Sequence, residues 1–342
     1  MVIDTQIIDV CNRHTAVATA GIALGGAYIR EGKLTAFPTE TVYGLGADAL
    51  NPGAVAAIFA AKGRAADNPL ISHIADFDWA ERLAYFSPLA LKLAEKFWPG
   101  PLTLVLRKKM LIPDIVCAGL PTAGLRFPAH PVALALIRAA GTPIAAPSAN
   151  TSGRPSPTLA AHVYEDLAGK LPLILDGGPV EIGLESTVVD ASGEIPLLLR
   201  PGKITVEQLL EIAGDVAYPT PGASLRPAAP GMKYTHYAPV GRVQLADDCA
   251  AVIGLRQQIV AASGKEPLLI VFGDTAAAMG QGDCFIIAQR GDMESFARNI
   301  FAAFRLADQQ KRRDIVVETV PEQGLGLAIM NRLRKSAGIG AK

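Results

Sequence analysis

Four cationic residues stand at the ends of predicted elements, where together they could neutralise phosphate. Lys62 and Arg64 follow a predicted helix, and Arg126 and Arg200 each close an apolar run that is typical of a strand. Converging cations stabilise phosphate oxygens and the charge that develops on departing pyrophosphate. Taken alone, Lys62 and Arg64 would more often be solvated residues at a helix end. As a set, the four cations indicate a pocket for a triphosphate.

Two polar loops follow apolar runs. The first lies within residues 37–49 and offers Thr39, Glu40, Thr41 and Tyr43 as donors and acceptors, and the second, Pro147-Ser-Ala-Asn-Thr-Ser-Gly153, offers a serine and an asparagine. Ligands collect at the carboxyl ends of strands in open α/β sheets. For each loop alone, hydrogen-bonded turns or cross-strand pairs are an equally good explanation. The same holds for Ser156, a possible helix N-cap, and for His73, which a buried strand could hold as a structural residue.

Familiar nucleotide and nucleophile motifs are absent from the sequence. Gly44-Leu-Gly-Ala-Asp-Ala49 matches a loose dinucleotide fingerprint, but the next predicted helix starts later, at Asn51-Pro52, so the required strand-to-helix turn is missing. Pro201-Gly-Lys203 lacks the rest of a P-loop. No serine or cysteine lies in an elbow motif. We therefore expect catalysis by positioning and charge neutralisation, with Mg²⁺ bridging the phosphates and no metal site of the protein's own.

Composition excludes several protein classes. The chain has 342 residues, is 50% hydrophobic and carries 32 basic and 32 acidic residues, so no whole-surface attraction to nucleic acid or to an anionic membrane is expected. Its four cysteines are scattered without a Cys-x-x-Cys pair, which argues against zinc modules and disulfides and fits a reducing cytoplasm. Neither a signal peptide nor a membrane segment is predicted.

The pattern of elements predicts an α/β protein with two domains. Helices are expected over residues 16–30, 52–61, 88–97 and 131–140, with another starting at Ser156-Pro157, and short strands lie between them. Thr205 and Gln208 form a capping box for a helix that runs to Ala213. We predict a catalytic domain over 1–213, a Pro/Gly-rich linker over 214–241, and a small parallel α/β domain over 242–342. The linker carries Lys233, Tyr234, His236 and Tyr237.

Five motifs together resemble the YrdC family, in the long form that makes threonylcarbamoyl-AMP. They are Phe37-Pro-Thr-Glu-Thr-Val-Tyr-Gly-Leu-Gly, Lys62-x-Arg64 with Asn68-Pro-Leu and His73, Trp98-Pro-Gly-Pro-Leu-Thr, Ala146-Pro-Ser-Ala-Asn150-x-Ser-Gly and Glu185-Ser-Thr-Val-Val-Asp190. Pro230-Gly-Met-Lys-Tyr-Thr-His-Tyr-Ala-Pro239 resembles the long form's linker. The resemblance implies a twisted mixed sheet with a concave active-site face, followed by a Rossmann-like domain. It also implies condensation of L-threonine, bicarbonate and ATP for threonylcarbamoyl-adenosine modification of tRNA.

The resemblance also assigns site residues. It implies that Lys62 and Arg64 are catalytic and that Tyr237 reaches back to the nucleotide, with the linker closing as a lid that excludes water. The threonine positions are Thr41, His73, Arg126, the backbone at Ala146, and Ser186. The nucleotide positions are Lys62, Arg64, Asn68, Thr122, Ser148, Asn150, Ser156, Arg200 and Tyr237.

Two rival functions and several partners remain to be weighed. YrdC-like domains also occur in carbamoyltransferases of hydrogenase maturation, but those carry cysteine-rich zinc modules that four scattered cysteines cannot build. A non-enzymatic module that binds double-stranded RNA is the second rival, with the basic run Arg332-Leu-Arg-Lys335 as its sequence signal. A downstream tRNA-modifying transferase is the expected partner of the synthase, whereas direct tRNA binding would be weak.

Overall fold

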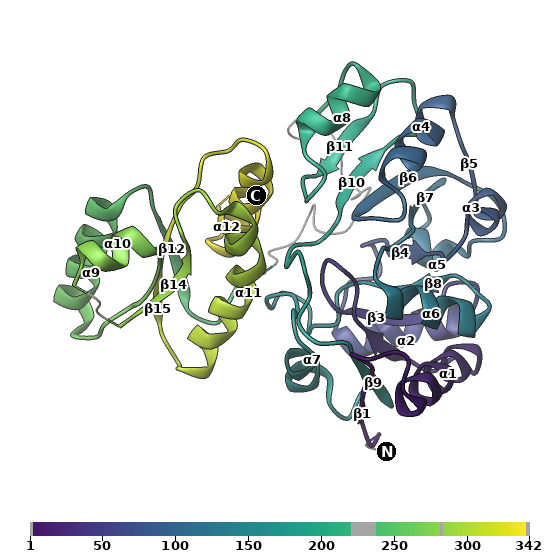
Figure 1. Ribbon diagram of the computed structural model, residues 1–342, viewed down its shortest axis with the longest axis horizontal. Coiled ribbons are helices and arrows are strands. Elements are labelled where there is room, and N and C mark those ends of the chain that lie inside the picture. The colour runs from purple at the N-terminus through teal and green to yellow at the C-terminus, as the bar shows by residue number, and fades with distance from the viewer. Residues whose placement is uncertain (1–2, 220–236, 281–282, 340–342) are drawn as a thin grey trace. The chain divides into compact units, whose positions relative to one another are not determined.

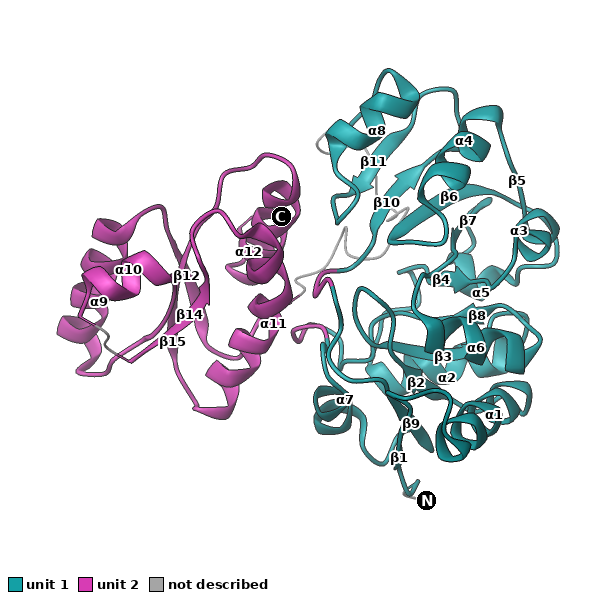
Figure 2. Ribbon diagram, in the orientation of Figure 1, with its two compact units in different colours: residues 1–152, 157–181, 185–232 teal, residues 153–156, 182–184, 233–342 magenta. Residues whose placement is uncertain are grey.

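The described residues of the computed structural model, 3–219, 237–280 and 283–339, form two sheets, each in its own unit (Figures 1 and 2). Unit 1 comprises residues 1–152, 157–181 and 185–232, and unit 2 comprises residues 153–156, 182–184 and 233–342. The two short segments in unit 2 were not anticipated from the sequence. Within the described residues, no helix is long and apolar enough to cross a membrane.

Unit 1 contains an eleven-stranded mixed sheet, which confirms the predicted α/β architecture. Its order is β1-β9-β2-β3-β8-β4-β7-β6-β10-β11, and β5 pairs with β6. The strands are β1 (Gln6–Asp9), β2 (Thr35–Phe37), β3 (Gly44–Asp48), β4 (Ile71–His73), β5 (Ala84–Tyr85), β6 (Leu102–Lys108), β7 (Thr122–Arg126), β8 (Ile144–Ala145), β9 (Leu173–Asp176), β10 (Thr187–Asp190) and β11 (Leu197–Arg200).

Helices cover both faces of this sheet. Alternate residues along each strand face opposite sides, so Ile174 joins one core while Leu173 and Leu175 join the other. Helices α1 and α6 pack in the second core, and α2, α3, α4, α5, α7 and α8 pack in the first. The helices of unit 1 are α1 (Ala16–Arg30), α2 (Pro52–Lys62), α3 (Phe77–Leu83), α4 (Pro88–Phe97), α5 (Asp114–Cys117), α6 (Pro131–Ala140), α7 (Ala160–Leu167) and α8 (Val206–Ala213).

Local sequence signals explain most helix ends. Asn51 accepts hydrogen bonds from Gly53 N and Ala54 N at the start of α2, and the predicted capping box of Thr205 and Gln208 is present at α8. The helix predicted to start at Ser156-Pro157 is wrong, because α7 begins at Ala160. Ser156 does not cap a helix, since the N-cap position of α7 is Leu159, and it is a buried residue at the end of a short segment that belongs to unit 2.

The first polar loop is shorter than the sequence suggested. Residues 38–43 form the turn, and β3 follows directly, antiparallel to β2. Gly46 is required in β3, since a Cβ there would lie 2.8 Å from Ile144 Cγ2 and 2.8 Å from Phe37 Cε1. The close approach that its glycines allow is therefore between neighbouring parts of the sheet.

Unit 2 is a small parallel α/β layer structure, as predicted. Its strands are parallel, in the order β12-β15-β13-β14, with α11 and α12 in one core and α9 and α10 in the other. The elements are β12 (Arg242–Ala246), β13 (Leu268–Phe272), β14 (Cys284–Ala288), β15 (Asp314–Glu318), α9 (Cys249–Ser263), α10 (Gly273–Ala278), α11 (Met293–Gln309) and α12 (Leu325–Ser336).

Helix α11 holds the two short segments of unit 2. The buried Arg305 donates from Nη2 to Pro155 O at 2.6 Å. Gly183 has a φ of +84°, and a Cβ there would lie 2.4 Å from Arg298 Cα, so only glycine fits. The domain boundaries at 213 and 241 stay predictions, and Lys233, Tyr234 and His236 of the linker lie outside the described residues.

Candidate active site

Arg126, at the end of β7, is the centre of a buried polar cluster. Its Nη1 donates to Thr41 Oγ1 at 2.9 Å, its Nε donates to Gly100 O at 3.4 Å, and its Nη2 lies 2.8 Å from Glu40 Oε1. Thr41 is held in place because Thr39 Oγ1 accepts from the backbone N–H groups of Thr41 and Val42. The turn between β2 and β3 therefore delivers Glu40 and Thr41 to the guanidinium.

His73 lies beside Arg126, because β4 and β7 pair with these two residues in register. Burial and the neighbouring Arg126 charge lower the pKa of His73 to about 3, so the imidazole is neutral at pH 7. Burial alone would raise the pKa of Glu40, but the Arg126 guanidinium and the donated N–H of Ala129 hold that pKa below its usual value. The cluster thus contains one carboxylate, one guanidinium and one neutral imidazole.

Ser186 and Arg200 continue this cluster across the sheet. Arg200 donates from Nε to Ser186 O and from Nη2 to Ser186 Oγ, each at 3.1 Å, and Ser186 Oγ lies 2.8 Å from Thr103 Oγ1. Thr103 in turn pairs in register with Arg126. A register shift between Val188 and Val189 places Arg200 opposite Val188, which itself pairs with Thr103. Irregularities of this kind re-aim side chains near functional sites.

Lys62, at the end of α2, holds the second polar loop in place through hydrogen bonds. Its Nζ donates to Ser148 O at 2.5 Å and to Asn150 O, and it lies 3.5 Å from Asn150 Oδ1. Ser148 Oγ donates to Asn150 Oδ1 at 2.5 Å, and Ser152 N donates to Lys62 O at 3.0 Å. Lys62 is 2% exposed. The Lys62 ammonium and the loop around Ser148 and Asn150 are therefore joined by direct hydrogen bonds.

Arg64 and Asn68 form a third group, after the left-handed Gly63 that ends α2. Arg64 donates from Nε to Asn68 O at 3.2 Å and from Nη2 to Pro69 O at 3.0 Å. Asn68 is buried, and its Oδ1 has no hydrogen-bond partner among the described residues. Two carbonyl groups of this loop, those of Asn68 and Pro69, thus fix the Arg64 guanidinium.

The other predicted site residues are more dispersed. Ala146 N donates to Ile71 O at 3.0 Å, which leaves that N–H occupied. Thr122 lies at the opposite end of β7 from Arg126, paired with Arg107. Ser156 and Tyr237 belong to unit 2, where Tyr237 has a φ of +68°, is 5% exposed and stacks on Phe301 with ring centroids 5.4 Å apart. The described residues thus place the Tyr237 ring in the core of unit 2.

Sequence reasoning did not assign a role to Glu40 or Thr103, although both lie in the quoted motifs. Glu40 lies in the polar turn, directly before Thr41, and both residues contact Arg126. A carboxylate next to a predicted threonine-binding residue is the feature of the sequence that could have identified it. Thr103 interrupts the apolar run of β6 at a buried position. All four cysteines are free, and among the described residues no group of three His, Cys, Asp or Glu side chains could hold a metal ion.

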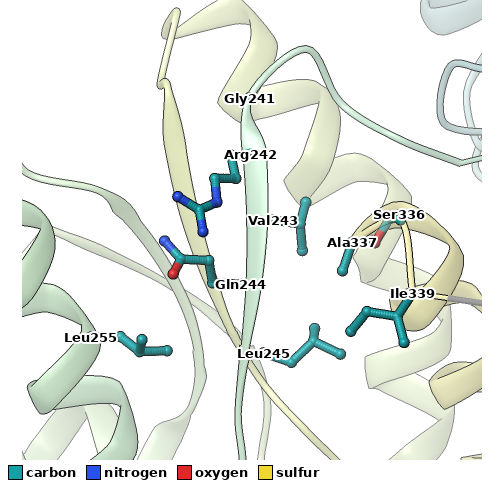
Figure 3. Close-up of a pocket in the computed structure, with 10 residues that line it drawn as sticks. Gly241, Arg242, Val243, Gln244, Leu245, Leu255, Ser336, Ala337 and Ile339 are labelled. Carbon is teal, nitrogen blue, oxygen red and sulfur yellow. The ribbon is translucent and has the colours of Figure 1, made fainter.

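A separate cavity of about 520 Å³ lies along β12 in unit 2 (Figure 3). Arg242 and Gln244 point to one side of this strand, whereas Val243 and Leu245 point toward the end of α12. None of the predicted site residues lines the cavity, and its lining carries a single charged side chain, Arg242. It offers no convergence of polar groups comparable to that around Arg126.

Comparison with protein families covers nearly the whole chain. A model of the Sua5/YciO/YrdC proteins, described as "Telomere recombination", matches residues 27–202, and a model described as "Threonylcarbamoyl-AMP synthase, C-terminal domain" matches residues 204–338. The chain is 48% identical to the threonylcarbamoyl-AMP synthase of Pyrococcus abyssi, over 93% of this chain and 94% of that protein. It is 46% identical to the enzyme of the same name from Bacillus subtilis, over 93% of each.

Solved structures agree. The crystal structure of P. abyssi Sua5 complexed with L-threonine matches with a TM-score of 0.89 at 44% identity, over 98% of this chain and 97% of the other. Escherichia coli YciO matches with a TM-score of 0.51 at 21% identity, over 58% and 96%, which supports the fold alone. The P. abyssi and B. subtilis relatives, each of which is covered over more than nine-tenths of its length, are named as synthases, so an RNA-binding module is not favoured. The chain belongs to the threonylcarbamoyl-AMP synthase family, in which a Sua5/YciO/YrdC domain is followed by a C-terminal domain of its own type.

Proposed function

We propose that this protein condenses L-threonine, bicarbonate and ATP into threonylcarbamoyl-AMP, pyrophosphate and water. The observation that carries the proposal is the near-complete similarity to two curated threonylcarbamoyl-AMP synthases. The buried clusters support it, since they combine cations, hydroxyls and a neutral imidazole but no nucleophile with a base. Such groups suit a reaction that needs two positioned substrates rather than a covalent intermediate.

The cluster around Arg126 is the proposed threonine site. Arg126 offers a guanidinium for the substrate carboxylate, and a guanidinium binds carboxylates through paired N–H groups. The P. abyssi relative was crystallised with L-threonine. The residues proposed to bind threonine are Thr41, His73, Arg126, the backbone at Ala146, and Ser186.

The cations around the second loop are the proposed ATP site. A carbamate oxygen on the threonine nitrogen would attack the α-phosphorus in line, and the bond to pyrophosphate would break. Cations fixed before the reaction stabilise the charge on the leaving phosphates, and Mg²⁺ arrives with ATP as part of the substrate. The proposed nucleotide residues are Lys62, Arg64, Asn68, Thr122, Ser148, Asn150, Ser156, Arg200 and Tyr237.

The product implies a partner. Threonylcarbamoyl-AMP is a mixed anhydride that water hydrolyses, so it requires protection until an acceptor is reached. We propose that a tRNA-modifying transferase receives it and uses it to form threonylcarbamoyl-adenosine. Direct contact with tRNA would be weak, because the chain has no net charge.

The test is pyrophosphate release from Mg-ATP by the purified protein with bicarbonate, with and without L-threonine, and with L-serine as a control. Release that requires threonine, and that falls sharply in Lys62→Ala and Arg64→Ala, is the expected result. Absence of ATP turnover under all these conditions would contradict the proposal. Steep salt-dependent RNA binding by the same inactive protein would then favour the binding module instead.

A further inference from the structure

Three buried polar atoms in the Arg126 cluster lack a hydrogen-bond partner among the described residues. They are Glu40 Oε2, Arg126 Nη2 and His73 Nδ1. Each of the three residues is 4% exposed. Buried polar atoms without hydrogen-bond partners are rare and unfavourable, so such a cluster suggests a ligand with complementary groups.

The two carboxylate oxygens of Glu40 differ: Oε1 has contacts within the protein, whereas Oε2 has no hydrogen-bond partner among the described residues. Oε1 accepts from Ala129 N at 3.2 Å and forms the 2.8 Å ion pair with Arg126 Nη2. The ion pair is a close charge contact, but the N–H groups of Nη2 are not aligned on an acceptor. Contacts with Thr41 and Gly100 fix the guanidinium independently. A fixed donor and a fixed acceptor of opposite charge therefore stand side by side.

This arrangement matches the two charges of an α-amino acid. The nitrogen and the carboxylate carbon of an amino acid are about 2.5 Å apart, so its two charged groups need partners that are close neighbours. Glu40 and Arg126 are such neighbours, because Glu40 Oε1 lies 2.8 Å from Arg126 Nη2 and Oε2 belongs to the same carboxylate. The residues proposed to bind threonine include a guanidinium for the carboxylate, but none of them is anionic. Glu40 is the buried anion in contact with that guanidinium, and its lowered pKa keeps it ionised.

We propose that Glu40 Oε2 accepts a hydrogen bond from the α-ammonium of L-threonine while Arg126 Nη2 binds the substrate carboxylate. Glu40 is then a specificity-determining residue that selects an amino acid over the corresponding hydroxy acid. The inference rests on the proposed function, because it assumes that threonine is the ligand. The carbamate formed from the amine retains one N–H, which can go on donating to Glu40 Oε2.

A purely structural role makes a different prediction. If Glu40 only orients Arg126, its loss weakens every ligand that uses the guanidinium. If Glu40 contacts the ammonium, its loss weakens only ligands that carry one. The discriminating pair is L-threonine and its α-hydroxy acid analogue, in which a hydroxyl replaces the ammonium.

The experiment is calorimetric titration of the full-length protein with both compounds, for wild type and Glu40→Gln. We expect wild type to prefer threonine by about 10-fold or more, and Glu40→Gln to lose about 10-fold or more in threonine affinity, since a hydrogen bond between charged groups is worth this much. Affinity for the hydroxy acid should stay within about threefold. Glu31→Gln, which removes an exposed carboxylate paired with Lys33, is the matched control.

Equal loss for both compounds in Glu40→Gln overturns the inference, as does an unchanged affinity for threonine. If Glu40→Gln does not fold, the preference of wild type decides: equal affinities for the two compounds overturn the inference, and a preference for threonine that Glu40→Asp reduces supports it. A wild-type protein that binds no threonine, with or without Mg-ATP, contradicts the proposed function itself.

Discussion

Replacing Lys62 by methionine tests whether this lysine builds the loop around Ser148 and Asn150. In the structure its ammonium donates to the carbonyl oxygens of both residues from a position that is 2% exposed. Methionine keeps much of the apolar stem but cannot donate. The substitution therefore removes the donor and leaves the packing largely intact.

The expected loss of stability follows from the carbonyl groups of Ser148 and Asn150, which both accept from Lys62. Each buried acceptor that loses its donor costs about 1–3 kcal/mol, and removal of a desolvated ammonium returns part of that loss. We expect a net destabilisation of about 2 kcal/mol. For a unit of this size, that lowers the melting temperature by roughly 4–8 °C. A misplaced loop should also reduce threonine-dependent pyrophosphate release by about 100-fold.

The assay is thermal melting together with pyrophosphate release, with Lys33→Met as the control. Lys33 is half exposed and pairs with Glu31, so its replacement should change stability by less than about 0.5 kcal/mol. A Lys62→Met protein that melts within a degree of wild type would refute the loop-building role. Lost activity at unchanged stability would instead mean that the ammonium acts on substrate alone.

Three further predictions follow from the described contacts. The pKa of His73 is about 3 in the folded state and 6.5 without burial, so the unfolded chain binds a proton more readily than the folded one between these pH values. The free energy of unfolding should therefore fall by about 1.4 kcal/mol per pH unit as the pH drops from 6.5 toward 3, and should not change for this reason above pH 6.5. His73→Gln should flatten this dependence in denaturant titrations at several pH values. Gly46→Ala should destabilise by about 1–3 kcal/mol, because its Cβ would meet Ile144, and unchanged melting would contradict the packing. Arg305→Met should lower the melting temperature by removing the donor to Pro155 O, whereas Arg256→Met, at an exposed position of α9, should not.

Elements were predictable where the sequence carries a local signal. The helix over residues 16–30 and the capping box at Thr205 were found with correct bounds, because caps and apolar periodicity act within a few residues. The segment 44–48 was not identified as a strand, since its glycines are poor strand formers. It is a strand because β2 and β8 pair with it on either side, and pairing between distant segments leaves no local signal.

The sequence named residues that the structure brings together, but it did not show how they are connected. The motifs named Ser186, Arg200 and Arg126, yet their link passes through Thr103, which lies in an apolar strand. It also depends on the register shift in β10 that places Arg200 opposite Val188. Neither a cross-strand register nor a bulge can be read from residue types alone.

All four cationic side chains are held by backbone carbonyl groups. Each donates to at least one backbone carbonyl: Lys62 to Ser148 O, Arg64 to Asn68 O, Arg126 to Gly100 O and Arg200 to Ser186 O. Backbone contacts therefore fix the direction of each charge before any substrate binds, which is the condition for electrostatic catalysis without reorganisation. Each of the three arginines donates hydrogen bonds from two nitrogens of one planar group: Arg64 and Arg200 from Nε and Nη2, and Arg126 from Nε and Nη1. Lysine has a single nitrogen and cannot reproduce such a pair of contacts in one plane, so arginine-to-lysine changes at these positions should impair the site although the charge is conserved.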